Sequence, residues 1–248
     1  MSTFKTKTNA AQISAKLLST SALTAVLAFT MNPAYAQDAT VPDVTVPEAP
    51  SIETPAAPEA PAAEAAWTGF TDESGSITVE TPTTTFTNIT QNTQLYVGTS
   101  ANLDIPEGYH VNIDQASSNY LFVAKAAPDA DPTFILGRLT ADGRVIIIDR
   151  NGVFTGANSV IDVAGIIMTT GDVDLEGLTE DEIKKVKASN VTEGAIELNG
   201  TITVADAGLA AFVAPTVVNA GVINATMGKV ALASGEAVTI DLAGDDLV

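Results

Sequence analysis

A repeat of about twenty residues constrains the fold of this chain more than any other feature. Residues 199–202, NGTI, resemble residues 220–223, AGVI, and the glycines of these segments, Gly200 and Gly221, lie 21 residues apart. Gly208 and Gly228 begin a second similar pair and lie 20 residues apart. A period near twenty is typical of solenoids, and these units carry strand-like runs without a helix. The repeat therefore predicts a parallel β-helix, in which successive coils stack about 4.8 Å apart.

Short β-favouring runs recur over residues 68–248 and predict an all-β domain. Gly, Asn or Asp separates most of them, as expected at turns. At about twenty residues per coil, this length predicts eight or nine coils, with small residues such as Ala211, Ala220 and Ala231 inside. An antiparallel β-sandwich is the alternative that two matching units leave open. The predicted strands are 76–81, 93–97, 110–114, 120–124, 145–149, 159–163, 166–170, 195–198, 201–204, 209–213, 222–224, 229–233 and 237–242.

One segment, residues 179–188, predicts a short surface helix that interrupts the strands. Thr179 and Glu182 have the spacing of a capping box, with acidic residues at the start and lysines at the end. Ile183 and Val186 would form its narrow apolar edge.

The first 67 residues predict an export signal followed by a linker. Residues 1–36 combine three lysines, an apolar run from Leu17 to Phe29 and the triplet Ala34-Tyr35-Ala36, which predicts a signal peptide cleaved after Ala36. Residues 37–67 are rich in Pro, Ala and acidic residues and predict a disordered, extended linker. Trp67, at its end, is expected to close the start of the folded domain.

Composition excludes several classes of function. The chain has no cysteine and a single histidine, His110, so disulfides, thiolate metal sites and histidine clusters are excluded. Its net charge of −19, with only 11 Lys and Arg, argues against binding to nucleic acid. We therefore expect no cofactor and no metal.

Three segments together resemble the two-partner secretion domain that begins filamentous haemagglutinins and related large exoproteins. Residues 135–156, ILGRLTADGRVIIIDRNGVFTG, are similar to the central signature of that family, and residues 163–170 to the segment that follows it. Residues 200–238 are similar to its C-terminal pattern. The resemblance covers about residues 75–248.

This resemblance implies a right-handed β-helix and a secretion module that is not an enzyme. Its expected partners are the Sec translocon, the periplasmic POTRA modules of an outer-membrane β-barrel transporter, and a host or neighbouring cell surface. The exoprotein would be adhesin-like and would reach the cell surface or the medium through the periplasm. An edge strand would then contact the POTRA sheets by β-augmentation.

The same resemblance assigns transporter recognition to the signature turn and the arginines around it. The family's NPNGI turn is represented by residues 149–153, so Asp149 and Arg150 replace its first Asn and its Pro, and a second family motif, NPNL, is absent. The candidate recognition residues are Arg138, Arg144, Asp149, Arg150, Asn151, Gly152 and Val153.

Other interpretations of these residues remain open from sequence alone. The Asn151-Gly152 pair also fits a purely structural turn with positive φ, and the arginines fit local charge balance with Asp142 and Asp149. A β-helical carbohydrate-active enzyme would use carboxylates such as Asp142, Asp149 and Asp162, although their spacing does not place them on successive coils. A passive adhesive rod is a third function.

Two further sets of residues have simple interpretations. Weak calcium binding would need Asp241, Asp245 and Asp246. His110 is expected to be a strand residue with an ordinary hydrogen-bond partner.

Overall fold

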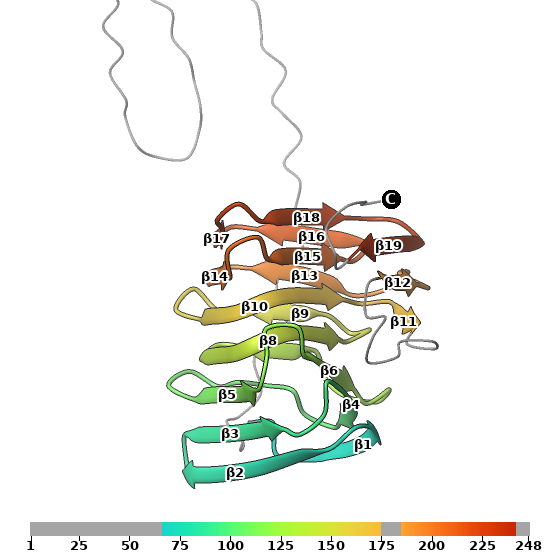
Figure 1. Ribbon diagram of the computed structural model, residues 1–248. Helices are drawn as coiled ribbons and strands as arrows, with labels where there is room; N and C mark the ends of the chain where they lie inside the picture. Colours follow the sequence, from blue (N-terminus) through green and yellow to red (C-terminus); the bar gives the residue numbers. More distant parts are fainter. Residues whose placement is uncertain (1–65, 175–184, 242–248) are drawn as a thin grey trace, which may run out of the picture. The chain divides into compact units, whose positions relative to one another are not determined.

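The chain winds into a stack of β-coils, shown in Figure 1. The structure is a computed structural model that describes residues 66–174 and 185–241. The described residues form strands and turns without a helix, so they contain no helix that could cross a membrane. The strands are β1 Phe70–Ser74, β2 Ile77–Thr83, β3 Phe86–Gln91, β4 Leu95–Ser100, β5 His110–Gln115, β6 Leu121–Ala126, β7 Thr133–Ile135, β8 Arg138–Ile148, β9 Val153–Thr155, β10 Val160–Thr169, β11 Asp172–Asp174, β12 Lys185–Ser189, β13 Ala195–Leu198, β14 Thr201–Val204, β15 Leu209–Val213, β16 Thr216–Asn219, β17 Val222–Ala225, β18 Lys229–Ala233 and β19 Ala237–Asp241.

Three parallel faces run along the stack and confirm the predicted solenoid. The first face pairs β3, β5, the start of β8, the start of β10, β14 and β17. The second pairs β4, β6, the end of β8, the end of β10, β15 and β18. The third pairs β7, β9, β13 and β16. Strands β8 and β10 pass from the first face to the second, with a register shift between Val163 and Gly165. The β-sandwich alternative is therefore wrong.

The number of coils is smaller than the repeat predicts. The first face holds six strands among the described residues, not eight or nine. A spacing of about twenty residues holds for some steps of the stack: Ile161 follows Leu139 by 22 positions, and Ile223 follows Ile202 by 21. Ile202 stacks on Ile161, 41 positions earlier in the chain, because β11 and β12 lie outside the stack between β10 and β13. Loops at the corners lengthen the earlier coils.

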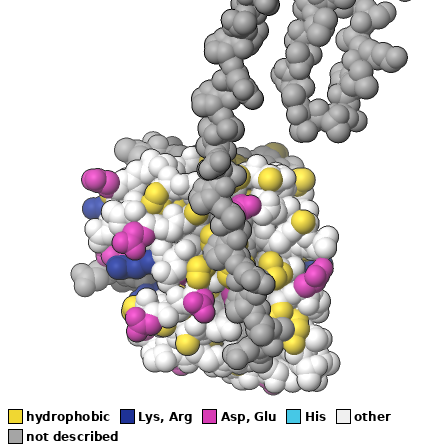
Figure 2. All heavy atoms as spheres, turned by 180° about the vertical axis from the view of Figure 1, so that it is seen from behind, with side chains coloured by type: hydrophobic (Ala, Val, Ile, Leu, Met, Phe, Trp, Pro, Cys, Tyr) yellow, Lys and Arg dark blue, Asp and Glu magenta, His cyan; other side chains and the backbone are white. Residues whose placement is uncertain are grey.

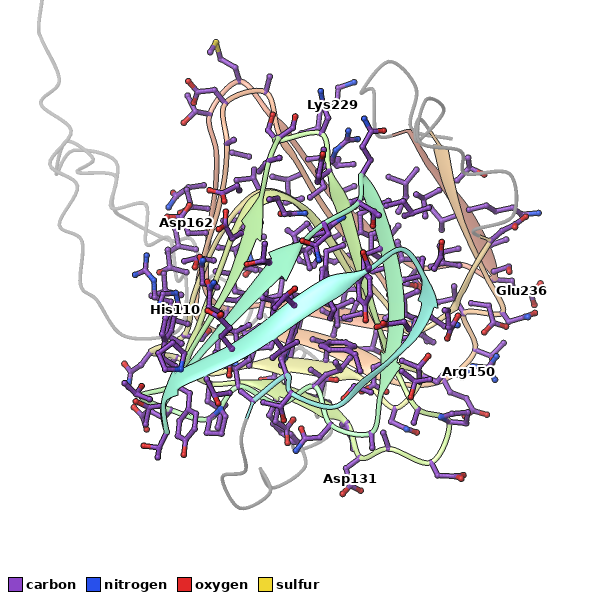
Figure 3. All side chains as sticks on the ribbon, turned by 60° about the horizontal axis from the view of Figure 1, so that its bottom comes forward. His110, Asp131, Arg150, Asp162, Lys229 and Glu236 are labelled. Carbon is purple, nitrogen blue, oxygen red and sulfur yellow. The ribbon has the colours of Figure 1, made fainter. Side chains whose placement is uncertain are left out.

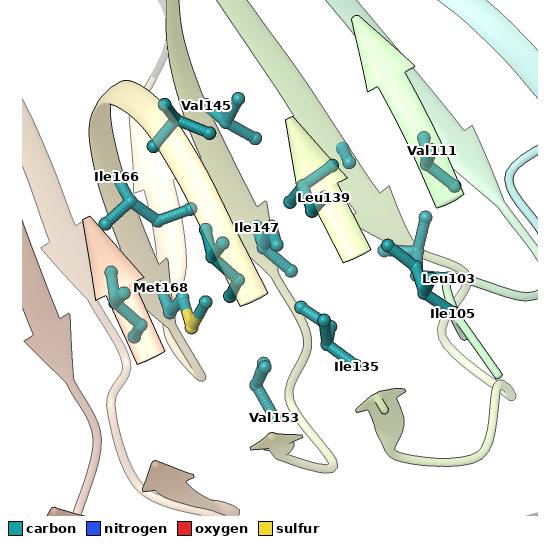
Figure 4. Packing of buried hydrophobic residues seen from close by; sticks show 14 of the residues in the cluster. Leu103, Ile105, Val111, Ile135, Leu139, Val145, Ile147, Val153, Ile166 and Met168 are labelled. Atoms are coloured by element: carbon teal, nitrogen blue, oxygen red, sulfur yellow. The ribbon is translucent and has the colours of Figure 1, made fainter. Parts of the chain in front are cut away.

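In-register columns of apolar side chains fill the inside of the stack. On the first face, Val111, Leu139, Ile161 and Ile202 lie at successive positions of one column and are all essentially inaccessible to solvent. Figure 4 shows members of this core facing one another across the coils. Because parallel strands pair residue with residue, each inward position stays inward in every coil.

A ladder of buried amides supports one corner of the first three coils. Gln91 Nε2 donates to the carbonyl oxygen of Leu121 at 3.0 Å, and Gln115 Nε2 donates to Gln91 Oε1 at 2.8 Å. Gln115 Oε1 then accepts from the amide of Gly143 at 2.6 Å. A Cβ at Gly143 would lie 2.7 Å from the carbonyl oxygen of Tyr120, so the corner needs glycine there. The ladder satisfies backbone groups that the bend removes from the sheet.

An aromatic cluster closes the N-terminal end of the stack. Trp67 is fully buried, and its indole Nε1 donates to the carbonyl oxygen of Leu103 at 2.8 Å. Its ring stacks on Phe122 with a centroid distance of 6.0 Å and meets Phe70 edge to face at 5.9 Å. The expectation that Trp67 closes the start of the fold is confirmed. Strands β1 and β2, which pair antiparallel with β4 and β3, form the outermost layer at this end.

A second, antiparallel sheet covers the outside of the second face. Strand β12 pairs with β11 on one side and with β19 on the other; we call these three strands the cover sheet. Val186, Ala188 and Ile240 of the cover sheet pack with Ile146 and Ile167 of the second face in an outer apolar cluster. The second face is therefore apolar on both sides, in contrast to the first.

The predicted surface helix over 179–188 is wrong where the structure describes it. Residues 185–189 form β12, and residues 179–184 lie outside the described residues. The alternation of buried Val186 and Ala188 with exposed Lys187 fits a strand over an apolar face. Tertiary burial therefore outweighs the helical charge pattern. The predicted signal peptide and residues 37–65 of the linker also lie outside the described residues.

Replacing Gln115 with Ala tests the amide ladder. The change leaves the amide of Gly143 and Gln91 Oε1 without their partners in a buried corner, and each unsatisfied group costs about 1–3 kcal/mol. We expect the free energy of unfolding, measured by urea denaturation, to fall by about 2 kcal/mol or more. Gln94→Ala, at an exposed glutamine next to the same corner, is the control and should change it by less than about 0.5 kcal/mol. Equal effects of the two substitutions would contradict the ladder.

Candidate functional site

The signature turn is a compact four-residue structure between β8 and β9. The amide of Gly152 donates to the carbonyl oxygen of Asp149 at 3.2 Å, which closes the turn. The carboxylate Oδ1 of Asp149 accepts from the amide of Asn151 at 2.8 Å, so the side chain caps the turn that it begins. The amide of Asp149 donates to the carbonyl oxygen of Thr169 in the next coil at 3.0 Å. The turn is thus fixed both within itself and to the stack.

The carboxylate of Asp149 is the buried centre of this turn. Asp149 is 1% exposed, and its Oδ2 accepts from Thr133 Oγ1 on the preceding coil at 2.7 Å. Burial raises the pKa of Asp149, although the hydrogen bonds from Thr133 and Asn151 act in the opposite direction. A carboxylate held by two donors in a closed turn positions the backbone and is inaccessible to a substrate.

Glycine is required at position 152 by its backbone conformation. Gly152 has φ of +125°, and an added Cβ would lie 2.8 Å from the carbonyl oxygen of Ala195. Asn151 is not among the described residues with positive φ, so the expectation of positive φ applies to Gly152 alone. Asn151 is exposed and donates from Nδ2 to the carbonyl oxygen of Ala130 at 2.6 Å. Val153, which follows, is fully buried in β9.

The three arginines are close in sequence but do not gather in space. Arg138 is exposed at the start of β8, where it pairs in register with His110. Figure 3 places His110 and Arg150 on opposite sides of the coil. Arg144 lies between Arg138 and Arg150 in the sequence, and its side chain is half-buried. It donates to the carbonyl oxygen of Asn119 at 3.1 Å and to Asn119 Oδ1 at 3.3 Å. Burial lowers the pKa of Arg144.

Local charge balance with Asp142 and Asp149 is not what the structure shows. Arg150 forms an ion pair with Asp172 at the start of β11, which also accepts from Asn190 Nδ2 at 2.8 Å. These hydrogen bonds lower the pKa of Asp172 and raise that of Arg150. The side chains of Arg150 and Asp172 are 62% and 42% exposed, so the pair contributes little stability. It does join the signature turn to the cover sheet.

The carboxylates considered for catalysis also lie apart. Asp149 is enclosed in its turn, Asp142 accepts from the amide of Gln115 at 3.2 Å, and Asp162 is exposed on β10. Among the described residues, no three His, Asp or Glu side chains are grouped so as to hold a metal ion. Of the suggested calcium ligands, Asp245 and Asp246 lie outside the described residues, as does the side chain of Asp241.

His110 has the ordinary strand role that was expected. Its Nε2 lies 2.8 Å from Thr140 Oγ1, and Thr140 Oγ1 donates to Asn112 Oδ1 at 2.6 Å. Because the threonine proton is already used, His110 Nε2 is the donor. Asn112 Nδ2 in turn donates to Asn88 Oδ1 at 2.8 Å, which makes a polar column on the outer side of the first face. Burial lowers the pKa of His110.

Acidic side chains dominate the charge on the surface. In Figure 2, Asp and Glu are scattered over the visible face, and the Lys and Arg side chains that can be seen lie next to them. That face therefore presents no basic stripe of the kind that follows a phosphate backbone.

The final described coil is a feature that the search for polar site residues missed. Val230 and Leu232 of β18 occupy inward columns below which Ala210 and Phe212 are fully buried, yet they are 44% and 48% exposed. Val222 of β17 is 55% exposed. The repeat carried a signal for this surface. It predicts the same inward apolar positions in every coil, so the last coil of a stack has apolar side chains that no further coil covers.

The described residues thus form a β-solenoid with a closed signature turn, a buried amide ladder and a last described coil that exposes apolar side chains. A profile of the TPS secretion domain matches residues 63–246, which is more than half of the chain. The chain therefore belongs to the family of TPS secretion domains, the export modules of two-partner secretion exoproteins. This family is not an enzyme family, and its exoproteins are exported across the outer membrane to the cell surface or released.

Two proteins of Haemophilus influenzae are similar to this chain. The heme/hemopexin-binding protein is 31% identical over 153 residues, which is 58% of this chain and 16% of that protein. The crystal structure of the HMW1 secretion domain has the same fold, with a TM-score of 0.65 and 21% identity, over 73% of this chain and 48% of that one. The chain thus spans only a small part of the length of the hemopexin-binding relative.

Substitutions at Asp149 separate the role of its charge from that of its oxygen atoms. Burial raises the folded-state pKa, so the folded chain binds the proton more tightly and the free energy of unfolding falls as pH rises from the usual value of 3.8 through the raised one. Asp149→Asn keeps an acceptor for the amide of Asn151 and restores the asparagine of the family pattern. We expect it to be at least as stable as the parent chain at pH 7 and to lose this part of the pH dependence.

Asp149→Ala is the matched comparison, since it leaves Thr133 Oγ1 and the amide of Asn151 without their acceptor. It should lower the free energy of unfolding by about 1–3 kcal/mol. Urea denaturation at pH 4 and pH 7 measures both variants. Equal losses for Asn and Ala at pH 7 would contradict the account of the turn.

Proposed function

We propose that this chain is the secretion and folding-nucleation module of a surface-exposed or secreted, adhesin-like exoprotein. The Sec translocon carries it into the periplasm, and the POTRA modules of a cognate outer-membrane β-barrel recognise it there. Residues 1–36 act as the signal peptide and the residues that follow as the linker, which ends where the buried Ala66 and Trp67 begin the secretion domain; that domain extends to residue 248. Adhesive contact with a host or neighbouring cell belongs to the exoprotein as a whole. Membership of the TPS secretion-domain family is the observation that carries this proposal.

The open C-terminal end supports the role in nucleation. Among the described strands, β16, β17 and β18 each have a parallel partner on one side only. Within the described part of the chain, this leaves one unpaired strand edge on each of the three faces, and Val230 and Leu232 of β18 are exposed at this end. A further coil placed on these edges would pair with all three strands and cover the apolar side chains. Each coil added in this way offers the same surface to the next.

The N-terminal end supports the direction of growth. Its outermost strands, β1 and β2, are mostly exposed and carry Glu73, Glu80 and Pro82. Charge and proline on an edge strand discourage pairing with another strand. Since Trp67 and Phe70 fill the inside at this end, the stack is closed here and grows at the other end. Growth outside the cell would draw the remaining chain through the transporter.

The signature turn supports a contact of limited size with the transporter. Of the seven candidate residues, Arg150 and Asn151 are exposed on the turn. Arg138 is exposed next to its register partner His110, which lies across the coil from Arg150 in Figure 3. Asp149, Gly152 and Val153 are buried and shape the turn, and Arg144 is half-buried. We therefore propose Arg150 and Asn151 as the contacting residues and the buried ones as their support.

The module function is tested by secretion from cells that contain or lack the partner barrel. With the barrel present, the chain should appear outside the cell. Without it, the chain should accumulate in the periplasm, because the family depends on a dedicated transporter. Undiminished secretion in its absence would overturn the proposal. Immunoblots of the medium, the cell surface and the periplasm measure the outcome.

The contact proposed for the turn is tested with two alanine variants. We expect Arg150→Ala/Asn151→Ala to weaken binding of the purified chain to the periplasmic part of the transporter by about tenfold, as for loss of a central polar contact worth about 1.4 kcal/mol. Arg138→Ala removes the same type of side chain from the opposite side of the coil and should leave the affinity within about twofold. Calorimetry measures both, and circular dichroism checks their folding. If Arg138→Ala weakens binding as much as the double variant, the turn is not the specific contact.

A further inference from the structure

The cover sheet joins strands from distant parts of the chain. Strand β12 precedes the fifth coil, whereas β19 follows the last described coil. In the antiparallel register, Val186 faces Ile240, Lys187 faces Thr239 and Ala188 faces Val238. Between β12 and β19 the chain completes β13 to β18. The edge of β12 is therefore paired by a strand that lies beyond six further strands in the chain.

Strand β19 is less enclosed than the strands in the middle of the stack, which are paired on both sides. It is an edge strand with β12 as its one partner among the described strands. Ile240 is fully buried, Val238 and Thr239 are half-buried, and Ala237 is exposed. The connection from β18, residues 234–236, is exposed throughout. Edge elements with few buried side chains open at lower free energy than the core.

The other strands of the cover sheet are fixed independently of β19. Strand β11 is tied to the signature turn by the ion pair of Asp172 with Arg150, and Asn190, just after β12, donates to Asp172. Strand β12 pairs with β11 through residues 187–189. Opening of β19 would therefore leave β12 in place, with an unpaired edge beside the outer apolar cluster.

We propose that the edge of β12 is an exchangeable strand-acceptor site, which β19 fills within the chain and which an extended strand of the transporter's periplasmic domain fills during secretion. A free strand edge that borders apolar side chains is the arrangement used in β-augmentation. The incoming strand would run antiparallel to β12 and carry apolar, β-branched residues at the positions of Val238 and Ile240. Backbone hydrogen bonds would give affinity, and these two side chains would give selectivity. The second half of this proposal rests on the proposed function.

The arrangement gives the exchange an order in time. Before residues 237–241 are available, the acceptor edge is open to the transporter. When β19 arrives, it is linked to the same molecule, and its effective concentration of about millimolar favours it over a separate strand. Completion of the last coils then releases the transporter, so the module is bound while incomplete and freed when folded.

A disulfide lock tests the exchange in the full chain. Lys187→Cys/Thr239→Cys places one cysteine on each strand at facing positions, away from the apolar side of the sheet. Because the chain has no other cysteine, no competing disulfide forms. The probe is a labelled synthetic peptide of residues 236–241, and binding is followed by fluorescence anisotropy.

The reduced double variant should bind the peptide, and the oxidised form should bind it at least tenfold more weakly. Ile240→Ala, which weakens β19 within the chain, should tighten peptide binding by about tenfold, whereas Leu232→Ala, a similar truncation on β18, should not change it. Equal binding to the oxidised and reduced forms would overturn the acceptor site. So would a failure of the Ile240→Ala variant to bind more tightly while its circular dichroism matches that of the parent chain.

The same lock tests the partner, using the transporter's periplasmic domain in place of the peptide. Stronger binding to the reduced form supports the proposal. Equal binding to both forms overturns the partner assignment but leaves the secretion function intact. Binding to neither form, while the peptide still exchanges, overturns the proposed function and leaves the acceptor site as a property of the fold.

Discussion

In-register pairing between parallel strands is the interaction on which the rest of this structure depends. It places like positions above one another, so that one inward isoleucine or valine in a coil requires an apolar partner in the next, as in the column of Leu139, Ile161 and Ile202. The same rule aligns the polar column of Asn88, Asn112 and Thr140 on the outside. Each coil therefore derives its order from its neighbour and has little to stabilise it alone.

This dependence explains why the two ends and the corners carry the specialised residues. The first coil has no earlier neighbour, and the aromatic cluster around Trp67 takes that place. At the corners, where the sheets bend, Gln91, Gln115 and the Asp149 turn supply hydrogen bonds that the ladders cannot. The last described coil lacks a neighbour and exposes Val230 and Leu232 instead. Within the described residues the two ends of the stack therefore differ: aromatic side chains close one, and apolar side chains are exposed at the other.

The sequence predicted the stack well where the repeat is regular and poorly where tertiary packing decides. The bounds of β13, β14, β15 and β18 agree with the predicted strands, because each is a short β-favouring run between turn residues. The number of coils was wrong, since the excursion through β11 and β12 interrupts the period. The runs VIII in β8 and IIM in β10 carried a signal for strands buried on both faces, which would have indicated the cover sheet. The helix prediction over 179–188 failed at residues 185–188 for the same reason.

The candidate site was less predictable than the fold. Sequence proximity suggested an arginine cluster, but the three side chains leave a winding chain in different directions, and Arg150 finds its acidic partner at Asp172, on a strand that was not predicted. The turn itself was foreseeable from Asn151-Gly152, whereas the burial of Asp149 depends on Thr133 in the preceding coil. The lengths of the corner loops decide which residues of neighbouring coils lie opposite each other. Because the spacing of the strands in this sequence is irregular, those pairs could not be predicted from it.

If each coil derives its order from its neighbours, order must decrease along the stack from its interior toward the last described coil. Hydrogen exchange of the purified full chain, followed by mass spectrometry of peptides, tests it most directly. The account predicts the slowest exchange in β8 and β10, which are paired on both sides, and markedly faster exchange in β17 and β18, which are paired on one side among the described strands. Equal protection in all of these strands, or slower exchange in β17 and β18 than in β8 and β10, would contradict it.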